Sequence, residues 1–466
     1  GKNMKKKHKI ARIVFITLGS LIIATSATVL GLFAYSWNYK IPVQAEKIEP
    51  TGTDLISTKN RSLYDKDGNI IKLNGINAGN ILLQEGWMSP FDLEPKKDKN
   101  GNLIKDKDGN LSYNEFSEEM FLDALSKNEN LKDHQEELKE YYYKSFFDEE
   151  DFKIIKNDLG LNTIRLPFYW RNILNDDFSR KEESIAFSYL NWFLENCKKN
   201  DLYCILDLHG APGSQNGYEH SGLIVDKPGF WGNETYENAV LDLWDYVSSY
   251  YSTTRSDLAP TIASYDILNE PQTSKKLGST TKVCWDYFDK VYQVIRKNND
   301  NHVITMEGCW DFSTLPDPKK YSWENVMYEY HHYNWQNNIV TMDMFKMYHM
   351  MRNIGKDYNV PILIGEFTYF EDRNAWNFAL NEWYDKYNYN WTVWNYKTTV
   401  TGWWTSSWGV YTVNLNLDTS KEETKTNVLT CTIEEFKAAC DKAKTSNCQT
   451  GTLKEILIEY KNSKSN

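Results

Sequence analysis

The sequence lacks the residue patterns of several common binding sites. None of its seven cysteines forms a Cys-x-x-Cys pair or has a histidine neighbour with ligand spacing, so we expect no metal ion and no other cofactor. The net charge is −11, and outside the N-terminus lysine and arginine are spread along the chain. No basic patch is left to hold a nucleic-acid backbone, so no nucleic-acid partner is expected. Repeats and low-complexity segments are absent as well, and 466 residues suffice for one large α/β barrel or for two ordinary domains.

One segment near the N-terminus lacks charge altogether. It runs from Ile13 to Tyr39 and follows a basic cluster at residues 4–12. Because a helix rises about 1.5 Å per residue, this run is long enough to cross a hydrocarbon core of about 30 Å. The preceding lysines favour a cytoplasmic N-terminus and a body outside the cytoplasm. We therefore expect a single-pass protein of the cell membrane, with these parts: a basic cytoplasmic segment at 1–12, a transmembrane signal-anchor at 13–39, a linker at 40–60 and the folded body at 61–466.

A cleaved signal peptide is the alternative for this segment. Val43-Gln44-Ala45 resembles a signal peptidase site, and cleavage after Ala45 would release a secreted protein. Both interpretations place the body outside the cytoplasm.

Exported proteins form disulfides readily, but an odd number of cysteines leaves at least one thiol unpaired. Apolar runs surround four of them, which is typical of buried thiols: Cys197, Cys204, Cys284 and Cys309. Whether one disulfide joins two of Cys431, Cys440 and Cys448 stays open.

Short apolar runs alternate with segments of helical pattern along most of the chain. A hairpin turning at Asp67-Gly68 precedes the first run. The eight runs occupy residues 71–78, 162–168, 203–208, 262–268, 302–307, 326–330, 361–367 and 391–396. Strands that alternate with helices form a parallel sheet, and eight such units closing on themselves make a (β/α)8 TIM barrel.

Polar and aromatic residues suited to a site recur at the ends of these runs. They are Arg165, His209, Glu270, Tyr333, Glu366 and Trp394. Barrel enzymes build their sites at the carboxyl ends of the strands, so we expect these side chains to converge there.

Two glutamates in this set have the chemistry of a glycosidase pair. Glu270 lies in Ser-Tyr-Asp-Ile-Leu-Asn-Glu-Pro and Glu366 in Pro-Ile-Leu-Ile-Gly-Glu-Phe. Cleaving a glycosidic bond needs an acid for the leaving oxygen and a second carboxylate for the sugar carbon, and a separation of about 5–5.5 Å predicts retention. Each motif also has a purely structural reading, because Asn before Glu-Pro can cap a helix.

A charged insertion separates the first two strands, at about residues 91–150. Two similar Asx-Gly turns are predicted at its start, one of which contains Gly109. A calcium loop is the weaker alternative, since aligning Gly109 and Glu115 with such a loop puts Ile104 where an aspartate is required. Residues 116–143 have the pattern of an acidic amphipathic helix near the rim of the barrel.

The combined motifs resemble glycoside hydrolase family 5 of clan A, over residues 63–397. The matching residues are Asn77, Glu85, Arg165, the string Asp-Leu-His-Gly-Ala-Pro-Gly-Ser-Gln-Asn-Gly at 207–217, Asn269-Glu270-Pro271, His331, Tyr333, Gly365-Glu366-Phe367 and Trp394-Asn-Tyr-Lys397. The long string at 207–217 looks most like the exo-β-1,3-glucanase and β-glucosidase branch.

The resemblance implies an extracytoplasmic retaining β-glycosidase that hydrolyses a β-glucan or glucoside by double displacement. In this interpretation Glu270 is the acid/base, Glu366 the nucleophile and Asn269 the donor to the sugar 2-hydroxyl. Glu85 matches an acidic residue that binds the terminal glucose in that branch.

The remaining site residues have roles that follow from their chemistry. Arg165 beside Glu366 would keep that carboxylate ionised, whereas Glu270 must hold a proton and so needs a raised pKa. Tyr333 can hydrogen-bond the nucleophile, and His209 and His331 can orient sugar hydroxyls or the carboxylates. Trp394 can form a stacking floor for the sugar ring.

Two departures from the branch leave the specificity open. Tyr218-Glu219-His220 stands where Phe-Asp-Asn is more usual, and Trp335 follows Tyr333 unexpectedly. An endo-β-glucanase and a glycosidase of a glucosylated lipid or cell-surface polysaccharide therefore remain alternatives, with the loop at 401–411 (Trp403, Trp404 and Trp408) as a wall or an extension of the cleft. A non-catalytic glycan-binding barrel is a remote alternative, because both carboxylates are present.

Overall fold

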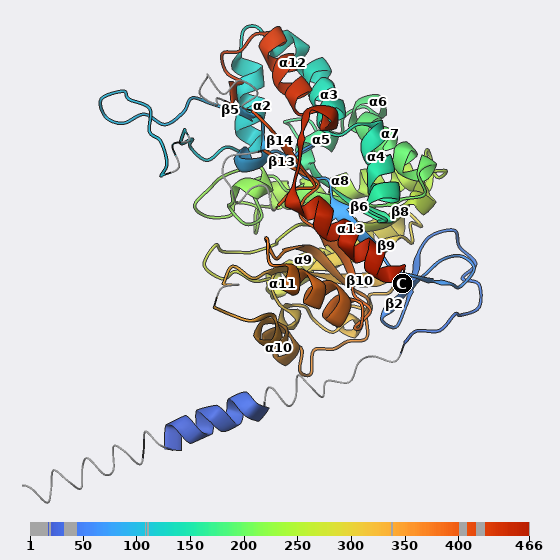
Figure 1. Cartoon of the computed structure of the whole chain (residues 1–466). Coiled ribbons are helices and arrows are strands. Elements are labelled where there is room, and N and C mark those ends of the chain that lie inside the picture. The colour runs from blue at the N-terminus through green and yellow to red at the C-terminus, as the bar shows by residue number, and fades with distance from the viewer. Residues whose placement is uncertain are drawn as a thin grey trace, which may run out of the picture.

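The computed structural model describes residues 17, 20–31, 44–107, 109, 111–336, 339–399, 408–415 and 425–465. Eight parallel strands close into a barrel in the order β10-β11-β12-β4-β6-β7-β8-β9. Their bounds are β4 (Asn74–Asn77), β6 (Thr163–Tyr169), β7 (Tyr203–Gly210), β8 (Ile262–Asp266), β9 (Val303–Glu307), β10 (Val326–Tyr333), β11 (Ile362–Thr368) and β12 (Asn390–Val393). Figure 1 labels β6, β8, β9 and β10 among them. Each strand falls on one of the eight predicted runs, so the predicted TIM barrel is confirmed.

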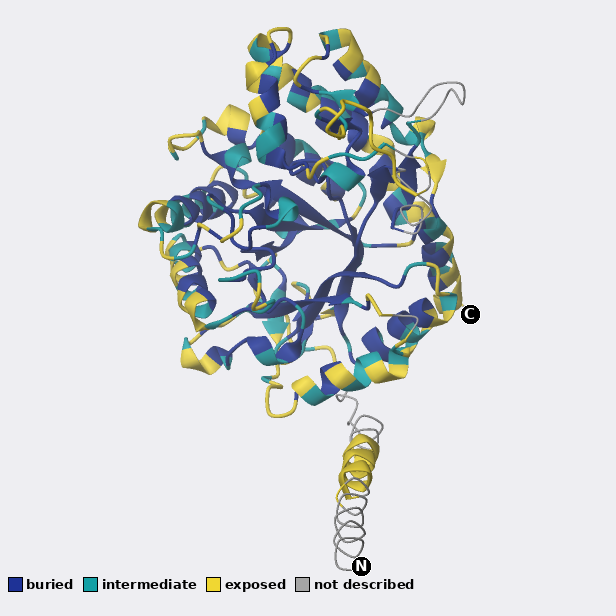
Figure 2. Cartoon of the chain, turned by 90° about the vertical axis from the view of Figure 1, so that its left-hand side faces the viewer, coloured by how far each residue is buried: buried dark blue, intermediate teal, exposed yellow. Residues whose placement is uncertain are grey.

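Helices surround this barrel because each connection between parallel strands must cross back over the sheet. Figure 2 shows the buried strands in the middle, with helices around them that turn their exposed faces outward. The main helices are α2 (Glu118–Lys127), α3 (Gln135–Phe146), α4 (Glu149–Lys153), α5 (Trp170–Ile173), α6 (Glu183–Ala186), α7 (Ser188–Lys199), α8 (Glu234–Ser252), α9 (Lys282–Lys297), α10 (Met342–Arg352), α11 (Arg373–Asn377), α12 (Ile433–Lys442) and α13 (Thr452–Lys464). Between β9 and β10 only the short 3-10 turns η6 (Phe312–Thr314) and η7 (Pro318–Lys320) intervene.

A small antiparallel sheet precedes the barrel, formed by β1 (Ser57–Lys59), β2 (Ser62–Tyr64) and β3 (Ile70–Ile71). The pairing of β2 with β3 confirms the predicted hairpin. An apolar cluster from this region closes the barrel near the N-terminal ends of the strands; it contains Ile56, Leu63, Leu73, Ile205, Ala263, Val303, Met327 and Leu363. The prediction of a linker up to residue 60 is therefore wrong at its end, since the folded body already includes Ile56 and β1.

The insertion between β4 and β6 folds as two turns and two helices. Bridges Lys97↔Leu103 and Lys105↔Leu111 close the two predicted turns. The predicted helix at 116–143 is instead divided into α2 and α3, because Asn128 ends α2 with an extended ψ of 115°. The Asn128 side chain donates hydrogen bonds to the carbonyls of Val428 and Cys431, so the C-terminal part of the chain fixes this break. Accordingly α2, α3 and α12 lie together at one end of the molecule (Figure 1).

The disulfide left open for the C-terminal cysteines is not formed. All seven cysteines are free thiols, and all but Cys448 are buried. Burial of the four thiols in the apolar runs is as predicted.

At the N-terminus, residues 20–31 are helical and exposed. Within the described part of the chain, no helix has both the length and the apolar character needed to span a membrane. Most of the predicted segment at 13–39 lies outside the described residues, so the anchor stays a prediction.

Candidate active site

The predicted site residues converge at the carboxyl ends of the barrel strands. Arg165 lies on β6, His209 on β7, His331 and Tyr333 on β10, Glu366 on β11, Asn269 and Glu270 after β8, Trp394 after β12, and Glu85 directly before the 3-10 turn η1 (Gly86–Met88). A cavity of about 490 Å³ opens here, and Glu85, Glu270 and Glu366 all contribute to its lining. Arg165, Asn269 and His331 lie beneath this lining and are fully buried or nearly so.

Glu366 is held by fixed hydrogen-bond donors. Nη1 of Arg165 donates to its Oε1 at 3.0 Å, and the hydroxyl of Tyr333 donates to its Oε2 at 2.8 Å. Both contacts were predicted from the sequence, and both are present. Burial and the charge of Glu366 raise the pKa of Tyr333 well above its usual value, so its hydroxyl keeps its proton for this bond.

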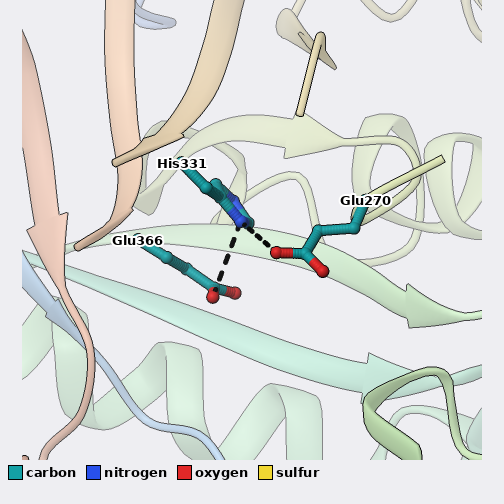
Figure 3. A group of neighbouring side chains, drawn as sticks. All are labelled: Glu270, His331 and Glu366. Atoms are coloured by element: carbon teal, nitrogen blue, oxygen red, sulfur yellow. Dashed lines mark hydrogen bonds and ion pairs between the residues drawn. The ribbon is translucent and has the colours of Figure 1, made fainter. Parts of the chain in front are cut away.

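Glu270 lies between two histidines. Nδ1 of His331 is 2.7 Å from its Oε1, and Nε2 of His220 is 2.7 Å from its Oε2. Figure 3 shows His331 between the two glutamates, with Nδ1 also 3.5 Å from Oε2 of Glu366. The backbone of Glu270 adopts φ +43°, a region that costs a non-glycine residue about 1–3 kcal/mol. Its N–H donates to Oε2 of Glu307 at 2.6 Å, which helps to hold this conformation.

The charge state of Glu270 differs from the prediction. Burial alone would raise its pKa, but the charge of His220 and the hydrogen bonds from His220 and His331 outweigh burial and hold the pKa well below its usual range. The expectation of a raised pKa for Glu270 is therefore wrong for the free protein, because the sequence did not reveal the His220 contact.

His209, Asn269 and Trp394 form the opposite side of the site. Nη2 of Arg165 donates to Oδ1 of Asn269 at 2.9 Å, which turns the amide nitrogen of Asn269 toward Nε2 of His209 at 3.4 Å. The other ring nitrogen of His209 lies 2.6 Å from Oδ2 of Asp207. The ring of His209 stacks on Trp394, with centroids 5.6 Å apart and an interplanar angle of 12°. The face of Trp394 is therefore held in place at the cavity.

Glu85 lies at another wall of the cavity and is 6 % exposed. The indole N–H of Trp87 donates to its Oε2 at 2.6 Å. Burial raises the pKa of Glu85 to about 8, despite the nearby charge of His220, which acts in the opposite direction. The carboxylate of Glu85 is thus held at the cavity wall by the indole of Trp87.

Further buried carboxylates lie beneath Glu270 and Glu366, and the sequence analysis assigned them no role. They are Asp207, Asp266, Glu307 and Glu329. Nε of Arg165 donates to Oδ2 of Asp266 at 2.9 Å, and Nε2 of His331 is 3.1 Å from Oε1 of Glu329. This layer orients the arginine and the histidine that contact Glu366 and Glu270. The only sequence signal for it is an acidic residue inside an apolar run.

Some of these side chains could in principle ligate a metal ion. Among the described residues, two groups bring donor atoms within 4.8 Å of one another: Glu270 with His331 and Glu366, and Glu307 with Glu329 and His331. Both groups use His331, whose two ring nitrogens already lie at hydrogen-bond distance from Glu270 and Glu329. We therefore describe both groups as hydrogen-bonded networks and assign no metal to them.

Aromatic side chains surround the mouth of the cavity. Trp335, flagged from the sequence as unexpected, is 65 % exposed, and its ring lies 5.3 Å from that of Tyr333 and 5.8 Å from that of Trp408. The sequence analysis did not identify the other aromatic lining residues, which are Trp87, Trp310 and Phe370. Residues 401–407 of the predicted tryptophan-rich loop, with Trp403 and Trp404, lie outside the described residues.

Known proteins share much of this sequence. A beta-xylosidase of Phanerodontia chrysosporium is 32 % identical over 275 residues, which cover 58 % of this chain and 50 % of that protein. A glucan 1,3-beta-glucosidase of Pichia angusta is 31 % identical over 275 residues, covering 56 % of this chain and 55 % of that protein. The chain thus spans about half the length of the curated relatives it matches first.

Solved structures share the fold. The crystal structure of AoRut superposes with a TM-score of 0.51 at 17 % identity, over 70 % of this chain and 89 % of that one. In sequence, residues 122–400 match the family model for cellulase, glycosyl hydrolase family 5, and this range contains every predicted site residue except Glu85. With a barrel of eight parallel strands and a match over more than half of its length, the chain belongs to glycosyl hydrolase family 5.

Proposed function

We propose that the protein is a retaining β-glycosidase that acts on β-linked glucans, of the exo-β-1,3-glucanase or β-glucosidase type, with Glu366 as nucleophile and Glu270 as acid/base. The observation that carries this proposal is the spacing of the pair. One carboxylate oxygen of Glu270 and one of Glu366 lie within 4.8 Å of each other. Retaining enzymes hold their carboxyl groups about 5–5.5 Å apart, whereas inverting enzymes leave about 6.5–9.5 Å for a water molecule.

The different surroundings of the two carboxylates support the division of roles. Arg165 and Tyr333 give Glu366 two permanent donors and fix its position, as a nucleophile requires. The carboxylate of Glu270, in contrast, contacts two groups that can exchange protons, His220 and His331. The sugar would lie between them against Trp394, with its 2-hydroxyl near Asn269.

The reaction then has two steps. A carboxylate oxygen of Glu366 attacks the anomeric carbon while Glu270 protonates the leaving oxygen, which gives a glycosyl-enzyme and a free aglycone. Glu270 next takes a proton from water as that water attacks the same carbon and displaces Glu366. The anomeric configuration is inverted twice and so retained.

Proton NMR of the first product anomer tests the mechanism. Hydrolysis of an aryl β-glucoside is expected to give the β-anomer first, and initial appearance of the α-anomer would refute retention. Glu366→Gln should abolish turnover but preserve ligand binding measured by calorimetry. An aryl β-xyloside belongs in the same assay, because one relative is named a beta-xylosidase.

Exo action is supported by the place of Glu85 at the wall of the cavity. Product analysis over time tests exo action: a protein starting at Glu46 is incubated with end-labelled β-1,3- and β-1,4-gluco-oligosaccharides. Release of single glucose units from the non-reducing end is expected. A ladder of internal products would instead indicate an endo-β-glucanase.

The aromatic mouth favours one second candidate, a glycosidase of a glucosylated lipid or another glucoside with an apolar aglycone. Trp335 and Phe370 line the cavity, and Trp335 is largely exposed. A large apolar aglycone would bury this surface. If this candidate holds, alkyl glucosides will show a KM that falls steeply with chain length in the native protein and much less in Trp335→Ala.

We also propose that the catalytic body lies outside the cytoplasm, tethered through the N-terminal segment. The support is the basic cluster at 4–12 followed by the uncharged run to Tyr39. Protease added to intact cells should then remove the body of the full-length protein. Protection from protease until the cells are lysed would contradict this location.

A further inference from the structure

His220 is a titratable side chain that contacts the carboxylate of Glu270 and that the family motifs did not indicate. It lies on the 3-10 turn η4 (Glu219–Ser221), in the connection between β7 and α8, and it lines the cavity. Its Nε2 is 2.7 Å from Oε2 of Glu270, while Oε1 of the same carboxylate is 2.7 Å from His331. Both oxygens of Glu270 therefore face an imidazole nitrogen.

This arrangement conflicts with a simple carboxylic acid as proton donor. A general acid must carry a proton when the substrate arrives. A carboxylate between two imidazole groups gives up its proton easily, since each protonated ring stabilises the negative charge. At 2.7 Å, however, one proton can lie on either atom: Nε2–H of His220 donates to the carboxylate, or Oε2–H of Glu270 donates to a neutral Nε2. The two forms contain the same number of protons.

Asn216 contacts the same ring nitrogen of His220. Its Oδ1 accepts a hydrogen bond from the backbone N–H of Tyr218 at 2.9 Å, which fixes the orientation of the amide. Its Nδ2 therefore faces Nε2 of His220, 3.0 Å away. An N–H can donate to Nε2 only when that nitrogen carries a lone pair. Nδ2 also donates to the backbone carbonyl of Glu270 at 3.2 Å, so Asn216 holds the ring of His220 beside Glu270.

We propose that His220 and Glu270 hold the catalytic proton together, with His220 as a positioning residue that returns the proton to Oε2 of Glu270 for the leaving group. This inference rests on the proposed role of Glu270 as acid/base. In the first step the proton moves from Nε2 to Oε2 and then to the leaving oxygen, whose bond to the anomeric carbon breaks with the electron pair going to that oxygen. His220 is left neutral and Glu270 ionised. In the second step the proton of the attacking water passes to Oε2 and back to Nε2.

The surrounding charges agree with a proton held by the pair. Facing His220 are Glu219 on its own turn, Glu85 before η1, Glu270 after β8, and the ring of His209 on β7, 6.4 Å away. Burial would lower the pKa of His220, but Glu270 and then Glu219 and Glu85 outweigh burial and raise it to about 10.

Glu270 has further neighbours on the side away from His220. They are His331 and Tyr333 on β10, Glu307 on β9 and Glu366 on β11. None of these makes a described contact with Oε2 of Glu270 as close as the 2.7 Å of His220, so His220 is the partner with which Oε2 shares the proton.

The first test needs no substrate. The ring signals of His220 are followed by NMR against pH in the full chain and assigned with His220→Asn. His220 is expected to stay protonated to about pH 10 in the native protein, and to titrate at least about two pH units lower in Glu270→Gln. Replacing the exposed His134 with Asn serves as the matched control, which should leave the His220 titration unchanged. If His220 instead titrates near pH 6.5 in the native protein and its titration is the same in Glu270→Gln, the inference is overturned.

The second test compares leaving groups in His220→Asn. For an unactivated alkyl β-glucoside, the alkaline limb of kcat/KM should move from about pH 10 to about pH 6 or below, which gives a loss of about tenfold or more at pH 7. For a dinitrophenyl β-glucoside, which needs no proton, the loss should stay below about threefold. An equal, pH-independent loss on both substrates would mean a merely structural role and would overturn the inference. If the native protein hydrolyses no glycoside, the proposed function has failed, and the NMR titration still decides the proton sharing.

Discussion

Replacing Tyr333 with phenylalanine removes one hydroxyl group from the catalytic pair and little else. The hydroxyl donates to Oε2 of Glu366 at 2.8 Å. The ring packs beside Trp335 and Trp408, with centroids 5.3 and 5.8 Å away, and phenylalanine keeps both contacts. The variant therefore isolates the contribution of a single hydrogen bond to the proposed nucleophile.

The expected loss follows from the strength of such a bond. A hydrogen bond to a charged group contributes about 1.5–3 kcal/mol, and about 1.4 kcal/mol corresponds to a factor of ten in rate. We therefore expect kcat/KM to fall by about 10- to 150-fold. The loss stays partial because Nη1 of Arg165 still holds Oε1 of Glu366 at 3.0 Å. Glu366→Gln, in contrast, should remove essentially all activity.

Steady-state hydrolysis of an aryl β-glucoside measures this loss. Tyr348→Phe is the matched control, because Tyr348 lies on α10 and is 48 % exposed. Thermal unfolding checks that both variants fold. A folded Tyr333→Phe protein with less than about threefold change would refute the reasoning, since the hydrogen bond would then contribute far less than such bonds do.

Three further predictions concern the acid/base, the buried layer and the insertion. Glu270→Ala should slow alkyl glucosides far more than activated aryl glucosides, and equal losses would count against Glu270 as the acid. Gly365→Ala should lower both the unfolding temperature and kcat/KM, because a Cβ there would lie 1.5 Å from Oε1 of the fully buried Glu329; unchanged values for both would contradict the packing. Burial raises the pKa of the Glu118 carboxyl to about 8, whereas its value in the unfolded chain is about 4.5. Between these two pH values the unfolded chain has lost the carboxyl proton and the folded chain still holds it, so the free energy of unfolding falls as pH rises. Glu118→Gln should therefore gain stability relative to the native protein from pH 5 to pH 8, by up to about 1.4 kcal/mol per pH unit, and a constant difference would refute it.

The barrel was predictable because each strand carries its own signal. A buried parallel strand is a short apolar run, and its position in the chain does not depend on distant residues. The same holds for Glu270 and Glu366, since a polar residue that ends such a run reaches the carboxyl end of the barrel wherever the run lies. Local pattern therefore sufficed for the fold and for the placement of the catalytic pair.

Features set by distant contacts were not predictable in this way. The pattern at 116–143 continues through Asn128, and only the carbonyls of Val428 and Cys431 explain why the helix ends there. The charge state of Glu270 is the same kind of case. Its sequence neighbours give no reason for a lowered pKa, because the imidazole groups that lower it come from η4 and β10.

The two glutamates have different hydrogen-bond partners, and each kind of partner suits one role in the proposed two-step reaction. Arg165 and Tyr333 keep their protons throughout, so the donors to Glu366 are the same before and after the glycosyl group is attached. Glu270 must change its charge by one proton between the two steps, and it is 5 % exposed. A buried group changes charge at a high cost unless a neighbour changes in the opposite direction. Transfer of one proton between Glu270 and His220 leaves their summed charge constant, so the proton can reach Oε2 of Glu270 without that cost before it passes to the leaving oxygen.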